Sequence, residues 1–572
     1  MSGLSKNCNM EKSWLKQYPQ GVSAEIKVDR YPSLLALVDD SLARHQALAA
    51  YKFMGRMIRY GEVDDASRAL AAWLQGQGLV RGDRVALMMP NVPQYPVAVV
   101  ALLRAGLVVV NVNPLYTPRE LEHQLKDSGA KAIIVMENFA ATLAAVLAQV
   151  PVKTVLLAAL GDMLGWARGR LVNHMVRHVR KLVPPFQFSG LPGLKLERFN
   201  AALAAGRRMR LAPALVGPDD IAVLQYTGGT TGVSKGAVLL HRNLVANVLQ
   251  AEAWYQPALK QIPAGEQIVT VCALPLYHIF GFSTNMMLSL RMGGCNLLIA
   301  NPRDIPALLK DLAAQPFHSF PAVNTLFTAI ANHADFDSVD WSHLKISVGG
   351  GMAVTQGTAR LWLDKTGCPI CEGYGLSETS PSATCNPVDA LAYTGTIGLP
   401  MPSTELTLLD DDGAEVPPGS AGEIAIRGPQ VMAGYWQRPD ETAKAMTADG
   451  FFRTGDIGTV VERGYFRIVD RKKDMILVSG FNVYPNEVED VLSQLAGVLE
   501  CAAVGIPDDK AGEAVKVVIV KKTPALTEAD VRAWCEANLT GYKRPKVIEF
   551  RTDLPKSTVG KILRRELREA TR

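Results

Sequence analysis

The residues with the clearest capacity for chemistry form the segment YTGGTTGVSKG at positions 226–236, which follows an apolar strand pattern at 221–224. Glycines allow tight turns that direct backbone N–H groups at an anion, while hydroxyl groups and an ammonium add donors and positive charge. These groups come from Thr227, Gly228, Gly229, Thr230, Thr231, Gly232 and Lys235. The segment predicts a polyphosphate-binding loop, with an ordinary Gly/Thr-rich turn as the alternative. It is not a Walker A loop, because Gly236 follows Lys235 where that loop has Ser or Thr.

Two other side chains are suited to catalysis. Lys561 follows Gly560 on a predicted loop before a basic helix pattern, and its ammonium could stabilise charge that develops during a reaction. His278 stands in PLYHIFG between apolar neighbours. By residue type alone, an exposed C-terminal cation and a satisfied core histidine remain the alternatives. The apolar stretch at 279–288, which includes Phe280, Phe282 and Met286, could line an alkyl tunnel or form plain helix core.

Composition narrows the class of protein. Hydrophobic residues make up 48% of the 572 and charged residues 20%, as in packed globular proteins. The net charge of only +5 does not favour a nucleic-acid-binding protein. Eight scattered cysteines and a polar N-terminus without the apolar core of a signal peptide indicate a reduced, cytoplasmic location. The most apolar stretch, 96–112, is interrupted by Arg104 and Gly106 and is short for a membrane span of ~20 residues.

The elements that must position these residues follow an alternating pattern. Buried strands are expected at 85–89, 107–112, 131–136 and 153–160, with amphipathic helices between them, which predicts an α/β fold with largely parallel sheets. From Leu406 the pattern changes to short strands with turn signals, typical of a small β unit. The charge cluster DRKKD at 470–474 precedes roughly a hundred residues with their own α and β patterns. We therefore expect a large domain at 1–470 and a small α+β domain at 471–572.

One segment stands out by charge. Residues 163–196 contain no acid, and apolar residues recur at helical spacing between 171 and 183 with cations among them. Such a basic amphipathic helix could lie on the inner face of a membrane as a peripheral contact. A surface helix that packs its apolar face on its own domain is the equal alternative.

The motifs taken together carry a resemblance. YTGGTTGVSKG resembles the phosphate-loop signature of the adenylate-forming (AMP-binding) superfamily. Six further motifs follow in that family's order: PLYHIFG (275–281), GGGMAV (349–354), EGYGLSETSP (372–381), FRTGDIG (452–458), DRKKDMILVSGFNVYPNEVED (470–490) and LPKSTVGKILRREL (554–567). The resemblance covers nearly the whole chain. Within the family it is strongest to the bacterial long-chain fatty-acid–CoA ligases.

The resemblance implies a reaction. A fatty acid and ATP, with Mg²⁺, would give an acyl-adenylate, and CoA would convert the adenylate to acyl-CoA and AMP. Lys561 would bridge the carboxylate and the α-phosphate, His278 would lie beside the carboxylate, and Glu378 with Thr227 would hold Mg²⁺. Phe280, Phe282 and Met286 would line the acyl tunnel.

The resemblance also implies a nucleotide site. Gly350, Gly351 and Met352 would line the adenine, Tyr374 would stack on it, Asp456 would accept the ribose hydroxyls, and Arg471 would approach the ribose or phosphate. The remaining nucleotide-binding residues belong to the EGYGLSETSP motif: Glu372, Gly373, Gly375 and Ser377, the last standing where the family commonly has Thr.

A rotation of the C-terminal domain about Asp470 would separate the two half-reactions and turn the CoA-side loop, Ser479, Gly480 and Phe481, toward the site. An aryl-CoA or medium-chain ligase and a catalytically silent scaffold are the competing interpretations. A homodimer is compatible with the sequence.

Overall fold

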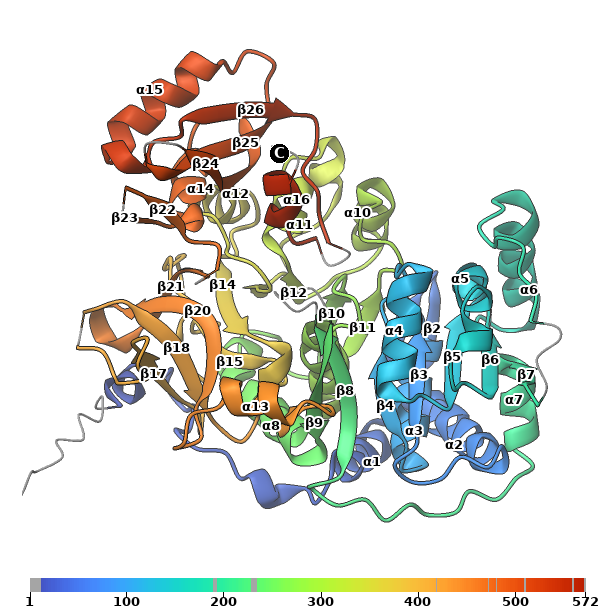
Figure 1. Cartoon of the computed structure of the whole chain (residues 1–572). Helices are drawn as coiled ribbons and strands as arrows, with labels where there is room; N and C mark the ends of the chain where they lie inside the picture. Colours follow the sequence, from blue (N-terminus) through green and yellow to red (C-terminus); the bar gives the residue numbers. More distant parts are fainter. Residues whose placement is uncertain are drawn as a thin grey trace, which may run out of the picture.

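The computed structural model describes residues 12–188, 193–227, 234–417, 419–471, 473–479, 481–508, 511–557 and 560–569. Its strands form sheets of eight, nine, four and five strands. Figure 1 shows the last of these sheets, in red, above the rest of the chain and beside α11 and α12. The mixed α/β fold, with a large N-terminal and a small C-terminal part, confirms the predicted fold class.

The eight-stranded sheet has the order β19-β9-β8-β4-β3-β5-β6-β7, and its six strands from β8 to β7 are parallel. Its strands are β3 (Arg84–Met88), β4 (Val108–Asn111), β5 (Ala132–Met136), β6 (Thr154–Ala158), β7 (Lys195–Arg198), β8 (Ile221–Thr227), β9 (Lys235–Leu240) and β19 (Gly434–Tyr435). The four strands expected at 85–160 are thereby confirmed.

Both faces of this sheet are buried, which explains the continuous apolar runs. In β3, Val85 and Leu87 enter one core cluster while Ala86 and Met88 enter another. The first cluster includes α2 (Tyr60–Gly76), α3 (Gln94–Arg104) and α7 (Phe199–Gly206), and the second includes α4 (Pro118–Ser128) and α5 (Ala140–Ala144). Local sequence sets the helix ends: Thr117 and Glu120 form a capping box before α4, and Gly129 ends it with φ +62°.

The nine-stranded sheet has the order β16-β15-β14-β13-β12-β10-β11-β1-β2. Its strands are β1 (Ala49–Phe53), β2 (Arg56–Arg59), β10 (Val269–Cys272), β11 (Cys295–Leu298), β12 (Ser319–Ala322), β13 (Ile346–Gly349), β14 (Ile370–Gly375), β15 (Ser382–Cys385) and β16 (Leu399–Pro400). One cluster packs it against α10 (Ile305–Ala313), α11 (Asn324–Ala331) and α12 (Gln356–Thr366). The helical segments α1 (Leu34–His45), α8 (His241–Leu259), η6 (Gly281–Met287, π-helical) and α9 (Leu288–Met292) contribute to the cluster that joins it to the eight-stranded sheet.

The small β unit expected from Leu406 is an antiparallel sheet of four strands, β17-β18-β20-β21. They are β17 (Glu405–Leu409), β18 (Gly422–Arg427), β20 (Phe452–Val460) and β21 (Phe466–Arg471), with α13 (Pro439–Ala445) between β19 and β20. The predicted domain boundary at 470/471 falls at the end of β21. The five-stranded sheet begins shortly afterwards, at Ile476.

The C-terminal sheet comprises β22 (Ile476–Val478), β23 (Phe481–Val483), β24 (Val498–Asp508), β25 (Gly512–Lys521) and β26 (Val547–Arg551). Its helices are α14 (Pro485–Ser493), α15 (Glu528–Asn538) and α16 (Arg564–Glu569). Its pairs are antiparallel except that of β25 with β26. A separate core cluster of β22, β24, β25, α14 and α15 side chains stabilises this part.

The charged segment forms α6 (Trp166–His174) and a π-helical turn, η5 (Met175–Val179), at the β6–β7 end of the eight-stranded sheet (Figure 1). Val176 is buried, whereas Trp166, Leu171 and Val179 are 75%, 61% and 62% exposed. The segment therefore packs one edge on its own domain and leaves other apolar side chains exposed. Among the described residues, no helix combines the length and the apolar character that crossing a membrane requires.

Candidate functional site

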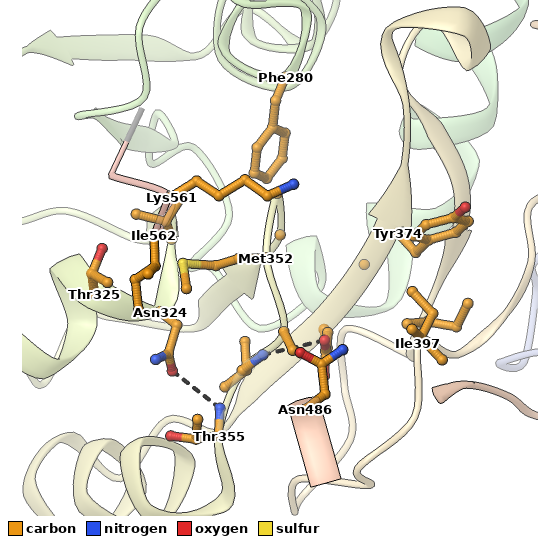
Figure 2. A pocket seen from close by; sticks show the side chains of 18 of the residues that line it. Phe280, Asn324, Thr325, Met352, Thr355, Tyr374, Ile397, Asn486, Lys561 and Ile562 are labelled. Atoms are coloured by element: carbon orange, nitrogen blue, oxygen red, sulfur yellow. Dashed lines mark hydrogen bonds between the residues drawn. The ribbon is translucent and has the colours of Figure 1, made fainter. Parts of the chain in front are cut away.

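A cavity of about 2000 Å³ lies where the large sheets, the small β sheet and the C-terminal part meet. The ends of β8, β13 and β14 contribute Thr227, Gly350 and Gly375 to its wall. Ligands of open α/β sheets bind outside the carboxyl ends of the strands, so the location is typical of a binding site. Figure 2 shows Phe280, Met352, Tyr374 and Lys561 around this cavity.

Lys561 is held at the cavity by its own loop. Gly560 has φ +81°, and a Cβ there would lie 3.0 Å from Oγ1 of Thr325 and 3.1 Å from a methyl carbon of Val323. The Thr325 hydroxyl donates to the Gly560 carbonyl (3.0 Å), and the Lys561 N–H donates to Oγ of Ser557 (3.1 Å). Glycine is needed here because the backbone is left-handed and lies against α11. The loop therefore places Lys561 in the wall of a cavity formed mainly by the rest of the chain.

His278 lies in the same wall, half-buried at the turn before η6. Its Nδ1 accepts the Phe280 N–H at 3.3 Å, which leaves the neutral ring's proton on Nε2. Burial, with the nearby positive charge of Lys561 as the smaller cause, lowers the pKa of His278 to about 4. The ring is neutral at pH 7, and the two residues that the sequence assigned to carboxylate chemistry lie within electrostatic range of each other.

The residues predicted to bind the nucleoside also come together. The Tyr374 hydroxyl donates to Oδ2 of Asp456 at 2.6 Å, although the two residues lie on β14 and β20. A Cβ at Gly350 would lie 2.9 Å from the Phe280 ring, so a side chain there would displace that ring. Gly351 has φ +79°, and it lines the cavity together with Met352. These contacts form one wall from segments far apart in sequence.

Glu372 is a buried carboxyl group in this wall. Its Oε1 accepts the Val354 N–H at 3.3 Å, and its Oε2 lies 3.4 Å from the Tyr393 hydroxyl oxygen. Burial raises the pKa of Glu372 to about 8, and the negative charge of Asp490 on α14 acts in the same direction. The carboxyl group is therefore mostly protonated at pH 7. Gly373, Gly375 and Ser377 line the cavity beside it.

The predicted phosphate loop is described only at its two ends, Thr227 and Lys235. Thr227 and Lys235 are paired at the ends of β8 and β9, and both line the cavity. The loop residues between them, Gly228, Gly229, Thr230, Thr231 and Gly232, lie outside the described residues. Glu378 is 7% exposed, and its Oε1 accepts the Tyr435 hydroxyl at 2.8 Å. A buried carboxylate and the Thr227 hydroxyl in one cavity are oxygen donors of the kind that Mg²⁺ prefers.

Some predicted residues lie elsewhere. Phe280 lines the cavity, but Phe282 and Met286 are 0% and 1% exposed in the core cluster, outside the cavity lining. Of the CoA-side loop, Ser479 and Phe481 are exposed and lie outside the lining, while Gly480 is not among the described residues.

The predicted hinge is bound to the C-terminal part by its side chain. Asp470 is fully buried, and its Oδ2 accepts the Asn486 N–H at 2.9 Å, while Oδ1 lies 3.6 Å from Arg564. Arg471 pairs with Asp456 through its backbone, and its side chain is not described. The hinge role of Asp470 stays a prediction.

Two residues that no sequence motif indicated, Tyr435 and Glu441, contact Glu378 and Lys235. They belong to AGYWQRPDETAKA at 433–445, which carries no recognisable spacing of catalytic residue types. A short strand of two residues, β19, brings them to the site by pairing with β9. The two aromatic residues after Gly434, Tyr435 and Trp436, were the sequence feature that could have indicated this segment.

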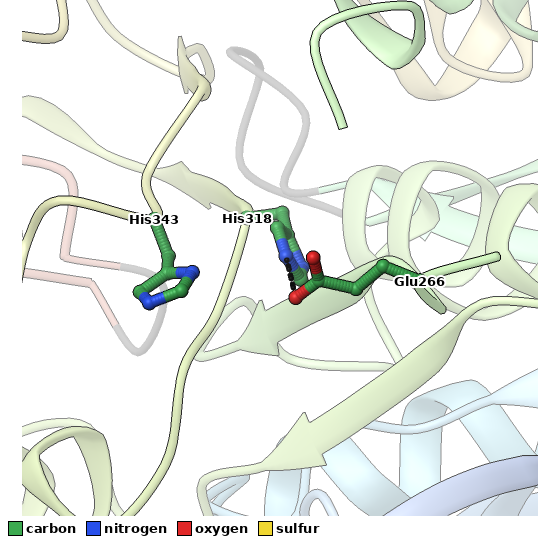
Figure 3. Close-up of side chains that lie close together, drawn as sticks. All are labelled: Glu266, His318 and His343. Carbon is green, nitrogen blue, oxygen red and sulfur yellow. Dashed lines mark hydrogen bonds and ion pairs between the residues drawn. The ribbon is translucent and has the colours of Figure 1, made fainter. Parts of the chain in front are cut away.

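A second cluster, Glu266, His318 and His343, offers three ligand atoms within 4.8 Å of one another (Figure 3). The Val269 N–H donates to Nδ1 of His318 at 3.0 Å, so Nε2 carries the ring proton and donates it to Glu266 at 3.0 Å. A metal on Nε2 would force that proton to Nδ1, against the Val269 N–H. The cluster therefore fits a hydrogen-bonded support for β10 better than a metal site.

Comparisons with known proteins decide the family. Residues 38–436 match the AMP-binding enzyme family, and residues 487–561 match the AMP-binding enzyme C-terminal domain. This chain belongs to the AMP-binding enzymes. The membership confirms the resemblance drawn from the motifs.

Relatives within the AMP-binding family extend over the full chain. A long-chain-fatty-acid–CoA ligase of Escherichia coli O6:H1 is 53% identical over 564 residues, which cover 98% of this chain and 99% of that protein. A protein of the same name from Bacillus subtilis is 34% identical, covering 98% of each. Among solved structures, ATP-bound MatB from Rhodopseudomonas palustris has a TM-score of 0.77 at 29% identity, covering 94% of this chain and 99% of that one. The anthranilate CoA ligase AuaEII in complex with anthranoyl-AMP has a TM-score of 0.82 at 25% identity, covering 95% and 99%.

Proposed function

We propose that this AMP-binding enzyme converts a long-chain fatty acid, ATP and CoA to acyl-CoA, AMP and diphosphate through an acyl-adenylate. Its full-length relatives with 47% to 53% identity carry the name long-chain-fatty-acid–CoA ligase. The observation that carries the proposal is the cavity that brings together Lys561, His278, the Tyr374–Asp456 pair and Glu378.

In the first half-reaction, a carboxylate oxygen of the fatty acid attacks the α-phosphorus and the bond to the diphosphate breaks. Both reactants are anions, so the site must supply positive charge and alignment. Lys561 would hold the carboxylate and the α-phosphate together, while Lys235 and the phosphate loop would hold the leaving diphosphate. The neutral His278 would donate its Nε2 proton as a hydrogen bond to the carboxylate.

The nucleoside would bind at the wall that Tyr374 and Asp456 form. Tyr374 would stack on the adenine, backed by Gly350, Gly351 and Met352, and Asp456 would accept the ribose hydroxyls. Glu378 and Thr227 would hold Mg²⁺, which adds positive charge at the phosphate oxygens when bound. Arg471 is assigned to the ribose or phosphate by the motif alone.

In the second half-reaction, the CoA thiol attacks the carbonyl carbon and AMP leaves. Lys561 lines the same cavity that the thiol must enter, so we propose that the part after residue 470 turns as a domain about Asp470. The turn would bring Ser479, Gly480 and Phe481 to the cavity for the pantetheine arm.

The acyl chain would occupy an apolar extension beside Phe280, where each buried CH₂ adds about 0.8 kcal/mol of binding. A panel of acids tests this proposal by measuring CoA-dependent AMP release. We expect a preference for chains of roughly twelve carbons or more. Equal turnover of acetate, benzoate and palmitate would contradict it, and a preference for benzoate or for a medium-chain acid would favour an aryl-CoA or medium-chain ligase. No adenylate with any acid would indicate a silent scaffold.

We also propose that α6 and η5 contact the inner face of a membrane in a cytoplasmic enzyme. Trp166, Leu171 and Val179 are exposed beside the exposed cations Arg170, Arg180 and Lys181. Exposed apolar side chains among cations suit an anionic lipid surface, where each cation near the surface contributes ~1 kcal/mol. Arg177 is excluded from this set because it pairs with the buried Glu137.

Flotation with phosphatidylglycerol vesicles tests this contact. The triple change Arg170→Glu, Arg180→Glu and Lys181→Glu should lower the bound fraction several-fold and leave activity in detergent unchanged. The matched control reverses the exposed Arg207, Arg208 and Arg210 after α7, with the same change of charge. An equal effect of both triples would contradict the contact. Light scattering of the parent protein without vesicles tests whether it forms a homodimer.

A further inference from the structure

Lys235, the lysine predicted to bind phosphate, forms an ion pair with a carboxylate of the same chain. Nζ of Lys235 is in close contact with Oε2 of Glu441, and both side chains are partly exposed. Lys235 lines the cavity at the start of β9, directly after the predicted phosphate loop. An anion that binds Lys235 therefore competes with Glu441 for its ammonium group.

Glu441 is held opposite Lys235 by an anchored element. Tyr435 pairs with Ala237 of β9, its N–H donates to Oγ1 of Thr442 (2.9 Å), and Thr442 Oγ1 donates to the Arg438 carbonyl (2.9 Å). The Arg438 guanidinium in turn donates to the carboxylate of the partly buried Asp127 at 2.6 Å. The start of α13 is thus fixed to the hairpin that carries Lys235, so the ion pair joins two elements of fixed relative position.

A second cation makes the ion pair easy to exchange. Nζ of Lys444, one turn later in α13, lies 3.3 Å from Oε1 of Glu441. The hydrogen bond from Lys235 and then that from Lys444 lower the pKa of Glu441, which keeps the carboxylate charged at neutral pH. When Lys235 is taken by another anion, Glu441 keeps Lys444. The Tyr435 ring, 5.5 Å from Nζ of Lys235, remains beside the ammonium.

We propose that Glu441 is a built-in counter-ion of Lys235, which the triphosphate of ATP displaces on binding and which returns when diphosphate leaves. The inference rests on the proposed function, because it assigns Lys235 to the phosphates. Glu441 competes with both ATP and diphosphate for one ammonium. It weakens the binding of both ATP and diphosphate and so speeds the release of diphosphate.

The test compares Glu441→Gln with Asp440→Asn. Asp440 is exposed and is the preceding residue in the same first turn of α13, so both changes remove one negative charge from the same helix end. We expect Glu441→Gln to lower the KM for ATP and the Kd for diphosphate about twofold to fivefold, the range of a partly exposed ion pair, with kcat for adenylation unchanged or lower. Asp440→Asn should change each constant less than half as much.

Calorimetry with diphosphate alone gives a readout independent of turnover, and raising the salt concentration should reduce the difference between parent and Glu441→Gln. Equal constants for the parent and Glu441→Gln, or equal shifts in both variants, would overturn the counter-ion role. Failure of every form, the parent included, to bind ATP or diphosphate would instead overturn the proposed function.

Discussion

Two loops of the C-terminal part, which the sequence assigns to different half-reactions, have opposite surroundings. The Lys561 loop contacts α11 through Gly560 and Thr325, and Lys561 lines the cavity. At the CoA-side loop, the Ser479 N–H donates to Ala511 at 2.7 Å, and Phe481 is 57% exposed and stacks on Tyr542 at 4.9 Å between ring centroids. Both of these partners belong to the C-terminal part itself.

The different positions of the two loops indicate that this arrangement of the C-terminal part suits the first half-reaction. A lysine at the cavity fits the attack of a carboxylate on the α-phosphate, and a CoA-side loop outside the lining cannot guide a thiol. Both loops belong to one compact part with its own core, so they cannot be exchanged by local motion. We infer that the second half-reaction requires the whole C-terminal part to turn.

The largest expected effect comes from Lys561→Ala. Loss of a preorganised charge should lower the rate of acyl-adenylate formation about 100- to 1000-fold. Conversion of supplied acyl-adenylate and CoA to acyl-CoA should be retained, because we assign the lysine only to the first half-reaction. The control Lys310→Ala removes an exposed lysine of α10. Equal loss in both half-reactions would contradict the assignment of Lys561 to adenylation.

Asp470→Pro should affect the second half-reaction and leave the first one intact. Proline fixes φ and removes an N–H, so thioester formation should fall on the order of 100-fold while adenylate formation survives. The same change also removes the acceptor for the Asn486 N–H. Asp470→Ala is therefore the control, since it loses that bond but keeps backbone freedom. If the alanine variant loses thioester formation as strongly as the proline variant, Asp470 does not act as a pivot.

Gly560→Ala tests how tightly the Lys561 loop must lie on α11. A Cβ at φ +81° is unfavourable by about 1–2 kcal/mol and also meets Thr325, so adenylate formation should slow roughly fivefold to 30-fold. Gly541→Ala is the matched control, because a Cβ there meets nothing within 4 Å. Stopped-flow measurement of each half-reaction should show no loss of thioester formation. A normal adenylation rate would show that the docking of Gly560 is dispensable.

The smallest effect concerns pH. The pKa of Glu372 is about 8 in the fold against an ordinary 4.5, so between these values the unfolded chain binds fewer protons than the folded one. The contribution of Glu372 to the free energy of unfolding is therefore fully present below about pH 4.5 and is lost as the pH rises toward 8. Ionised Glu372 would also repel Asp490, whose carboxylate accepts the Gln356 N–H at 3.0 Å between α14 and α12.

Glu372→Gln should remove this loss. Its Tm relative to the parent should rise by a few degrees from pH 5 to pH 8, because a chain of 572 residues shifts its Tm by less than the roughly 2–4 °C per kcal/mol of a 150–250-residue protein. Glu462→Gln, at an exposed position, provides the control. Parallel Tm curves for the parent and Glu372→Gln would show that Glu372 is already ionised in the fold.

The sequence by itself determined the local structure and the order of the motifs. The strands of the first parallel sheet were predictable because both faces are buried, which leaves continuous apolar runs such as Val85–Met88. The change to short strands at Leu406 and the charge cluster at 470–474 marked the small sheet and the place where the next sheet begins. Motif order also indicated the family, since those residue types are needed at fixed positions along the chain.

Only the tertiary structure decided which distant residues meet. Tyr374 and Asp456 are 82 positions apart, and Thr325 and Gly560 are 235 apart, yet each pair shares a hydrogen bond. It placed Phe280 in the cavity and Phe282 in the core. The two residues are two positions apart on one helical segment and therefore point to opposite sides of it. It also brought Glu441 to Lys235 through β19, a strand of two residues. Sequence patterns report the periodicity within an element, whereas contacts between elements depend on how the buried faces of separate sheets pack.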